Sequence, residues 1–356
     1  MQRGEIRPGR SSATLVRHPA QWKGDGAVMS SVQTVRTSFV IDVGVVAPEG
    51  GHQVVVDVFA PSAGVEDVSV LWWLQPGGGM SRRYWDLDVP ADVGNYSFAR
   101  YLASRGFVAV AIDHLGVGES SRPADGFSLT SEVVADVNAY AFDQVIAGLR
   151  SGTLVDDLPP LPGLVSIGCG HSAGASLTIY QQARHRSHQA LCLFGYGGRG
   201  LPSYLDPELV RYANDPEALR RDIVDLVRAR NPDPLPTLPR GNSELLVAVP
   251  IAESVHEALV AARTNLLAVA GFSTMIPGNA APEIAMIDVP VFIGHGDKDI
   301  GAPLHEVGSD FSGSDDVTLY RLAESGHNHN VSPNRERLWG RVVAWADAFR
   351  CDRKPW

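Results

Sequence analysis

The stretch from Leu164 to Tyr180 reads LVSIGCGHSAGASLTIY, and the prediction of the fold starts from it. Its first part, Leu164 to Cys169, is a short apolar run typical of a strand buried on both faces. Its last part, Ala173 to Tyr180, has the pattern of a helix start. Between them the sequence has glycine on both sides of Ser172, in the pattern Gly-x-Ser-x-Gly, which allows a sharp strand-to-helix turn. Ser172 is therefore the candidate nucleophile.

This five-residue pattern is not specific by itself, because short glycine patterns also arise by accident. A serine hydroxyl is a poor nucleophile at neutral pH unless a base takes its proton and an acid orients that base. The prediction therefore requires a base and an acid downstream of Ser172.

The composition excludes several classes of function. The chain has 40 acidic and 30 basic residues and a net charge of −10, which disfavours binding to nucleic acid and to anionic membranes. No segment has the length of a membrane span, and the N-terminus lacks the apolar core of a signal peptide. Three scattered cysteines do not form a disulfide framework. We expect a soluble cytoplasmic protein without nucleic-acid or membrane partners, and a homodimer is left open.

Alternating strand and helix patterns predict an α/β fold with a doubly wound, mostly parallel sheet. An antiparallel hairpin is expected at the sheet edge, where residues 34–46 and 52–59 flank a turn sequence. Further strand patterns cover residues 68–74, 108–112, 164–169, 190–194, 289–293 and 316–322, and helical patterns cover 96–104, 131–149, 173–184 and 335–349. Ligands are expected outside the carboxyl ends of the parallel strands.

One gap between strands, residues 199–283, is too long for a simple crossover connection. We expect it to form a helical cap inserted over the carboxyl edge of the sheet, between the two core segments 34–198 and 284–356. Its helical patterns cover residues 206–212, 216–230 and 255–270, with a proline-rich run at 231–239. Residues 1–33 lack periodicity and are expected to be a flexible leader.

Two other strand patterns end in residues that suit Ser172 as partners. The strand 289–293 is followed by Gly294-His295-Gly296-Asp297-Lys298-Asp299, and the strand 316–322 by Ala323-Glu324-Ser325-Gly326-His327. The chain order is thus serine, aspartate, histidine, with each residue at the carboxyl end of a different strand.

With these motifs the chain resembles the α/β-hydrolase superfamily, in its capped form, over roughly residues 68–349. Residues 74–79, Leu-Gln-Pro-Gly-Gly-Gly, resemble the oxyanion loop of that family, although Gln-Pro stands where a histidine is usual. Residues 113–120 resemble its Asp-x-x-Gly-x-Gly-x-Ser turn.

The resemblance implies a role for each candidate residue. Ser172 would be the nucleophile, His327 the general base and acid, and Asp299 the partner of that histidine. The oxyanion would be held by the backbone N–H of Ala173 and by that of Gly78 or Gly79.

Two neighbouring residues compete for the acid and base roles. Asp297 is an alternative to Asp299, but the family places a proline four residues after the acid, as Pro303 follows Asp299. His329 is an alternative to His327, which follows a glycine as the family histidine does. The two histidines have no third ligand at recognisable spacing, so no metal is expected. His114, His171 and His295 are expected to be core or supporting residues.

A second glycine pattern, Gly195-Tyr196-Gly197-Gly198-Arg199-Gly200, matches the dinucleotide-binding fingerprint Gly-x-Gly-x-x-Gly. That fingerprint requires a helix to begin among the glycines, and here prolines follow instead. We interpret the segment as a hinge into the cap and expect no cofactor.

The predicted function is hydrolysis of a carboxylic ester or lactone, a small-molecule apolar substrate of medium to large size that the cap encloses. Apolar cap residues are expected to face the cleft: Leu245, Leu246, Val247, Leu259, Leu266, Leu267, Phe272 and Met275. A carbon–carbon bond hydrolase of the ring-cleavage type is the alternative, because the same triad serves that chemistry. A non-catalytic receptor on the same fold and a dinucleotide-dependent oxidoreductase are more remote alternatives.

Overall fold

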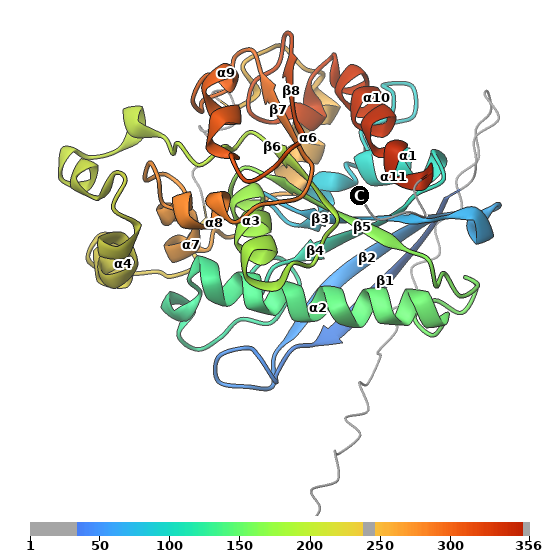
Figure 1. The fold of residues 1–356 in the computed structure, drawn as a ribbon, viewed down its shortest axis with the longest axis horizontal. Coiled ribbons are helices and arrows are strands. Elements are labelled where there is room, and N and C mark those ends of the chain that lie inside the picture. Colours follow the sequence, from blue (N-terminus) through green and yellow to red (C-terminus); the bar gives the residue numbers. More distant parts are fainter. Residues whose placement is uncertain (1–33, 238–245, 352–356) are drawn as a thin grey trace, which may run out of the picture.

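The computed structural model describes residues 34–237 and 246–351 and is built around an eight-stranded sheet (Figure 1). The strands lie in the order β1-β2-β4-β3-β5-β6-β7-β8. They are β1 Thr34–Asp42, β2 Gln53–Pro61, β3 Val70–Gln75, β4 Val108–Asp113, β5 Val165–His171, β6 Ala190–Phe194, β7 Val291–Gly296 and β8 Val317–Leu322. Only the pairs β1–β2 and β2–β4 are antiparallel. The predicted edge hairpin and mostly parallel sheet are confirmed, with strand ends moved by a few residues.

Helices cover both faces of the sheet (Figure 1). They are α1 Phe98–Ser104, α2 Ser131–Ser151, α3 Ala173–His185, α4 Pro216–Arg230, α6 Glu253–Ala261, α7 Ala268–Ser273, α8 Ala281–Ala285, α9 Leu304–Val307, α10 Arg335–Ala346 and α11 Ala348–Cys351. Helices α2 and α3 pack together on one face, and α1 and α10 pack on the other. The predicted helices of the core are confirmed, and the expected leader, residues 1–33, lies outside the described residues.

The two adjacent tryptophans of β3 show how the sheet is buried on both sides. Successive side chains of a strand point to opposite faces, so one apolar run supplies two cores. Trp72 makes edge contacts with Phe98 and Phe107 on the α1 face. Trp73 makes an edge contact with Phe142 of α2 on the other face. Both tryptophans are fully buried, so the central strands hold the site on a rigid base.

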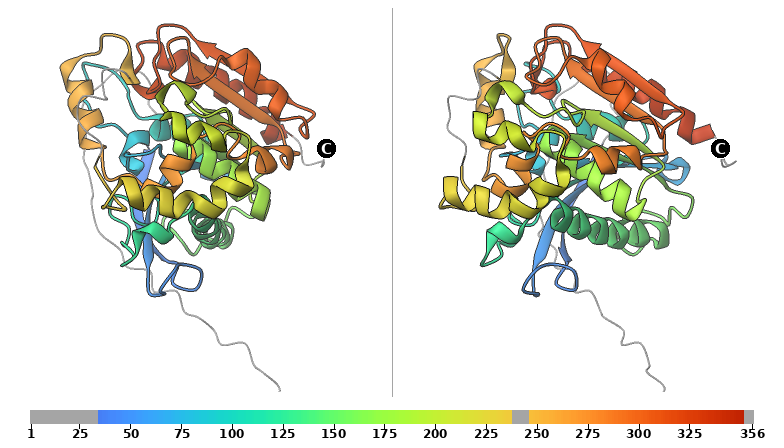
Figure 2. Two further views of the ribbon diagram at one scale, coloured as in Figure 1. Left: turned by 90° about the vertical axis from the view of Figure 1, so that its left-hand side faces the viewer. Right: turned by 60° about the vertical axis from the view of Figure 1, so that its left-hand side comes forward.

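The insertion between β6 and β7 is divided into parts. Helices α4 and α7 pack on each other in a small apolar cluster of their own. Helix α6 joins the aromatic core next to α1 and α10, while α8 packs on α3. Figure 1 shows α4 standing out to the left of the sheet, and Figure 2 shows it from that side, in front of the strands.

The predicted helix over residues 255–270 is wrong, because the structure has two helices, α6 and α7, with an extended segment between them. The backbone of that segment bonds to distant partners instead of forming a helical ladder. Ser81 N–H donates to Ala262 O, and Thr264 N–H donates to Gly79 O, both at 2.9 Å. These bonds attach the break between the helices to the glycine loop after β3. Of the other cap patterns, 216–230 is confirmed as α4, whereas 206–212 is a 3-10 turn, Pro207–Tyr212.

No helix within residues 34–237 and 246–351 combines the length and the apolar composition that crossing a bilayer requires.

Candidate active site

Ser172 lies in a strained turn between β5 and α3. Its φ of 54° and ψ of −122° fall in a region that residues with a side chain rarely adopt. The flanking glycines are required, since a Cβ at Gly170 would lie 2.4 Å from Gly174 O and one at Gly174 would lie 2.3 Å from Gln75 O. Ser172 N–H donates to Phe194 O at 2.7 Å, which attaches the turn to β6. Strain of this kind is typical of a nucleophile held out at a sheet edge.

Asp299 and His327 form a buried hydrogen-bonded pair. Oδ1 of Asp299 lies 2.7 Å from Nδ1 of His327, and the two side chains are 4% and 6% exposed. Burial by itself would raise the pKa of Asp299, but the charge and hydrogen bond of His327, together with a hydrogen bond from His329, hold that pKa well below its usual value. Asp299 is therefore ionised at neutral pH. His327 borders the same cavity as Ser172.

Asp297 does not take part in this pair. It is exposed, and its Oδ1 accepts from the Ser325 N–H at 3.0 Å, a bond that lowers the pKa of Asp297. The other competitor, His329, does reach the site, because its Nε2 lies 3.0 Å from Oδ2 of Asp299. The structure thus brings Asp299 and His327 together and leaves Asp297 outside.

His171, directly before Ser172, contacts the loop that carries His327. Its Nε2 lies 2.7 Å from the backbone oxygen of His327, and its ring stacks on Tyr84 with centroids 4.7 Å apart. Burial, followed by the charges of His327 and His329, holds the pKa of His171 well below its usual value. His171 is therefore neutral, and its Nε2–H donates to the His327 carbonyl, which makes it the supporting residue we expected.

The glycine loop after β3 lies beside the nucleophile. A Cβ at Gly77 would lie 3.2 Å from the Ser172 Cβ, and one at Gly78 would lie 3.6 Å from the Ala173 Cβ. Gly79 has a φ of 75°, which favours glycine, and turns the chain away. Gly78 and Ala173, both predicted oxyanion donors, are therefore close in space. Gly77, for which the sequence suggested no role, is also next to the nucleophile.

A buried chain of hydrogen bonds holds this loop where the family's usual histidine is missing. Asn138 of α2 donates to Gln75 Oε1 and to His114 Nδ1, both at 2.9 Å. The proton of His114 is therefore on Nε2, which donates to Pro76 O at 3.2 Å. Burial lowers the pKa of His114 and keeps it neutral. Because C=O and N–H of a trans peptide point in opposite directions, this bond turns the Gly77 N–H away from His114.

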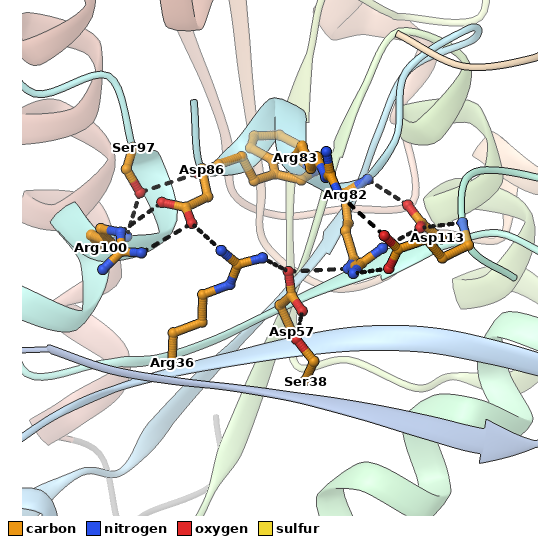
Figure 3. Close-up of polar contacts among 11 residues, drawn as sticks. Arg36, Ser38, Asp57, Arg82, Arg83, Asp86, Ser97, Arg100 and Asp113 are labelled. Carbon is orange, nitrogen blue, oxygen red and sulfur yellow. Dashed lines mark hydrogen bonds and ion pairs between the residues drawn. The ribbon is translucent and has the colours of Figure 1, made fainter. Parts of the chain in front are cut away.

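Arg82 anchors the same loop from its other end (Figure 3). Its guanidinium contacts the carboxylate of Asp57 at 3.0 Å and those of Asp113 and Glu119 at 2.5 Å. The backbone N–H of Arg82 also donates to Asp113, at 2.6 Å. Burial would raise the pKa of Asp57, but the charges of Arg82 and Arg36 lower it overall. The network therefore fixes the loop after β3 against β2 and the end of β4.

Two cavities flank the turn that carries Ser172. The first is bordered by Ser172 and His327 together with His295, Thr274 and the segment 195–201. The second is more apolar and lies behind the glycine loop, where it is bordered by Gly77, Gly78, Ala173, Leu177, Leu266 and Leu267. Burial lowers the pKa of His295 to about 4, so its imidazole is neutral in the first cavity.

The glycine-rich segment 195–200 forms a wall of the first cavity. A Cβ at Gly195 would lie 2.9 Å from the His327 ring, so the glycine allows close approach to the base. The next element is a 3-10 turn, Pro202–Tyr204, and no helix begins among the glycines. The helix terminus that a pyrophosphate needs is therefore missing at this place.

The cap residues that border the cavities are only partly the predicted ones. Leu266 and Leu267 border the second cavity, beside the glycine loop, and not the first cavity with Ser172. Phe272 instead packs in the cluster of α4 and α7, and neither Phe272 nor Met275 borders either cavity. The reason is the break before α7, which brings the leucines to the loop and turns Phe272 toward α4. Leu245 lies outside the described residues.

Within the part of the chain that the structure describes, no group of His, Cys, Asp and Glu is arranged to hold a metal.

Comparisons with known proteins agree with this architecture. An esterase from Exiguobacterium antarcticum superposes with a TM-score of 0.56 at 17% identity, covering 85% of this chain and 98% of its own. An esterase from Thermogutta terrifontis gives 0.55 at 15% identity, covering 89% and 99%. The thioesterase domain from the curacin biosynthetic pathway gives 0.53 at 17% identity, covering 83% and 96%. At such identities these structures show a shared fold.

No curated protein sequence matches the chain. The model of the alpha/beta hydrolase family, however, matches residues 70–338, which is most of the sequence and includes Ser172, Asp299 and His327. From this match and from the strand order and strained serine turn described above, we conclude that the chain belongs to the alpha/beta hydrolase family.

Proposed function

We propose that this chain is a serine hydrolase that cleaves a carboxylic ester or a lactone through an acyl-enzyme. One observation carries the proposal. His327, joined to Asp299 at 2.7 Å, borders the same cavity as the serine held in the strained turn. A base oriented by an ionised acid, next to a strained serine, is the arrangement that acyl transfer requires.

The steps follow from this geometry. Ser172 Oγ attacks the acyl carbonyl, and Nε2 of His327 takes its proton, because Nδ1 is bonded to Asp299. The oxyanion accepts hydrogen bonds from the Ala173 N–H and from an N–H of the glycine loop 77–79. When the intermediate collapses, His327 returns the proton to the leaving alcohol. Water then attacks the acyl-enzyme by the same route, which releases the acid and restores Ser172.

The two cavities support a substrate with one apolar part. The second cavity, with Leu177, Leu266 and Leu267, suits an alkyl or ring portion, whose burial contributes roughly 25 cal/mol per Å². The first cavity offers the neutral imidazole of His295 and the hydroxyl of Thr274 to polar atoms on the other side of the carbonyl. We therefore propose that the cap segment, together with the loop after β3, selects the substrate.

The first prediction tests the nucleophile. Ser172→Ala should lower kcat on short p-nitrophenyl esters by roughly 10⁴-fold or more, and a fluorophosphonate should no longer label the protein. Ser176→Ala, one turn along α3, is the matched control and should keep the labelling. Labelling of Ser172→Ala at the wild-type rate would contradict the assignment.

If wild type cleaves a ring-cleavage ketone but no ester or lactone, carbon–carbon hydrolysis replaces ester hydrolysis as the function.

A further inference from the structure

Asp299 forms hydrogen bonds with two histidines, although the proposed triad uses only one of them. His327 Nδ1 lies 2.7 Å from Oδ1, and His329 Nε2 lies 3.0 Å from Oδ2. The His329 side chain is 1% exposed and does not border the cavity with Ser172. The second histidine therefore contacts the acid from the side away from the substrate.

The proton of His329 can be assigned from its neighbours. The Gly296 N–H is shared between two acceptors, Nε2 of His329 at 3.0 Å and Oδ2 of Asp299 at 3.4 Å. Nε2 itself lies 3.0 Å from that carboxylate oxygen, and Nδ1 of His329 has no hydrogen-bond partner. Without a proton, Nε2 would direct its lone pair at a carboxylate oxygen, and the two electron-rich atoms would repel each other. With a proton there, Nε2 donates a charge-assisted bond to Asp299, and the Gly296 N–H gives up its contact with Nε2 and keeps the longer one with Oδ2 of Asp299, at 3.4 Å. The unpaired Nδ1 is then an acceptor, which is easier to leave buried than an N–H.

We propose that His329 is a positioning residue that keeps Asp299 ionised and turned toward His327. This inference rests on the proposed function. The other donors to Asp299 are distant, since the amides of Gly296 and Gly301 lie 3.4 Å away. Two imidazole donors on the two oxygens fix the plane of the carboxylate, so Oδ1 stays aligned with His327 through the reaction.

The titratable groups around Asp299, His327 and His329 stay neutral during the reaction. They are His171 from β5, with its ring centroid 5.6 Å from that of His329, His295 from β7 and Tyr84 from the turn after β3. Burial lowers the pKa of His295 to about 4, holds that of His171 well below its usual value and raises that of Tyr84. These three groups therefore keep their charge through the neutral pH range and do not contribute to the pH dependence of activity there.

The second prediction compares two substitutions of His329. His329→Phe keeps a ring but removes the donor, and kcat should fall about 30-fold to 100-fold with KM nearly unchanged. A carboxylate that has lost a donor holds the proton of His327 more strongly. The acid limb of the kcat/KM profile should therefore move to higher pH. His329→Gln keeps an N–H that can reach Asp299. It should restore kcat and return the acid limb of the kcat/KM profile to its wild-type position.

Proton NMR gives a readout that does not depend on turnover. Besides the signals of the other hydrogen-bonded histidines, wild type should show downfield imidazole N–H signals from both His327 and His329, and His329→Phe should lose the one from His329. A Phe variant that keeps every downfield signal of wild type overturns the inference, as does a Phe variant with wild-type kcat and pH profile. Equal losses in the Phe and Gln variants with an unmoved acid limb indicate packing alone and also overturn it. If wild type is not labelled at Ser172 but shows both signals, the proposed function fails while the contact with Asp299 stands.

Discussion

Asp297 and Asp299 are two residues apart and have the same side chain, yet their surroundings differ. Asp299 is buried against two imidazoles, and its pKa is held well below the usual value. Asp297 is exposed and accepts a backbone N–H from the loop after β8. Only Asp299 can therefore fix the tautomer of His327 and stabilise its charged form.

The third prediction separates these two acids. Asp299→Asn should lower kcat by about 10⁴-fold, because an amide can present N–H to Nδ1 and leave the histidine in the wrong tautomer. Asp297→Asn changes an exposed turn and should cost less than about tenfold. Steady-state kinetics on one ester with both variants gives the ranking. The reverse order would transfer the acid role to Asp297.

At the level of single residues, the sequence indicated Ser172, Asp299 and His327 because each follows a strand pattern, and parallel strands end at one edge of the sheet. It offered His329 only as a competitor of His327, and the structure shows both histidines on one carboxylate. Their joint contact depends on how the loop after β8 folds back on β7, which no local pattern encodes. The place of Gly77 beside Ser172 was missed for the same reason.

The break between α6 and α7 is the element that sequence patterns could not predict. Apolar residues continue at helical spacing through residues 262–267, so periodicity alone favours one helix. The backbone there bonds instead to Gly79 and Ser81 after β3, and Leu266 N–H donates to Pro236 O at 2.7 Å. Tertiary hydrogen bonds thus override a local pattern, and they bring two leucines to the glycine loop.

The fourth prediction concerns this element. A Cβ at Gly78 would lie 2.7 Å from Leu266 Cδ1, so the leucine lies directly on the loop beside the second cavity. Leu266→Ala or Leu267→Ala should enlarge that cavity and change kcat/KM between short and long acyl chains by roughly tenfold to a hundredfold. The measurement is a series of p-nitrophenyl esters of increasing chain length.

Phe272→Ala is the matched control for these leucines. Phe272, a residue of α7, packs in the cluster that α7 forms with α4 and borders neither cavity. The substitution should lower stability while leaving the ranking of chain lengths unchanged. Fluorophosphonate labelling of Ser172 should stay nearly constant in every variant, because the probe is small. A ranking that changes with Phe272 and not with the leucines would move substrate selection to the α4–α7 cluster.

In the molecule as a whole, four buried histidines link folding to pH. Burial lowers the pKa of His114, His171, His188 and His295, to about 3 for His188 and about 4 for His295. An unfolded histidine takes up its proton near pH 6.5, so below that pH the unfolded chain binds more protons than the folded one. Stability therefore falls as the pH drops below about 6.5, and each such histidine contributes about 1.4 kcal/mol per pH unit until its folded pKa is reached.

The fifth prediction isolates one of these groups away from the active site. His188 packs edge-on against Phe142, and its Nε2 has no hydrogen-bond partner. His188→Gln cannot take up a proton on unfolding, so the loss of unfolding free energy between about pH 6 and pH 4 should be shallower by about 1.4 kcal/mol per pH unit. Urea denaturation at several pH values measures this slope. His305→Gln, whose wild-type side chain is 83% exposed, is the control and should leave the slope unchanged. Equal slopes for wild type and His188→Gln would mean that His188 is protonated inside the fold, which its burial opposes.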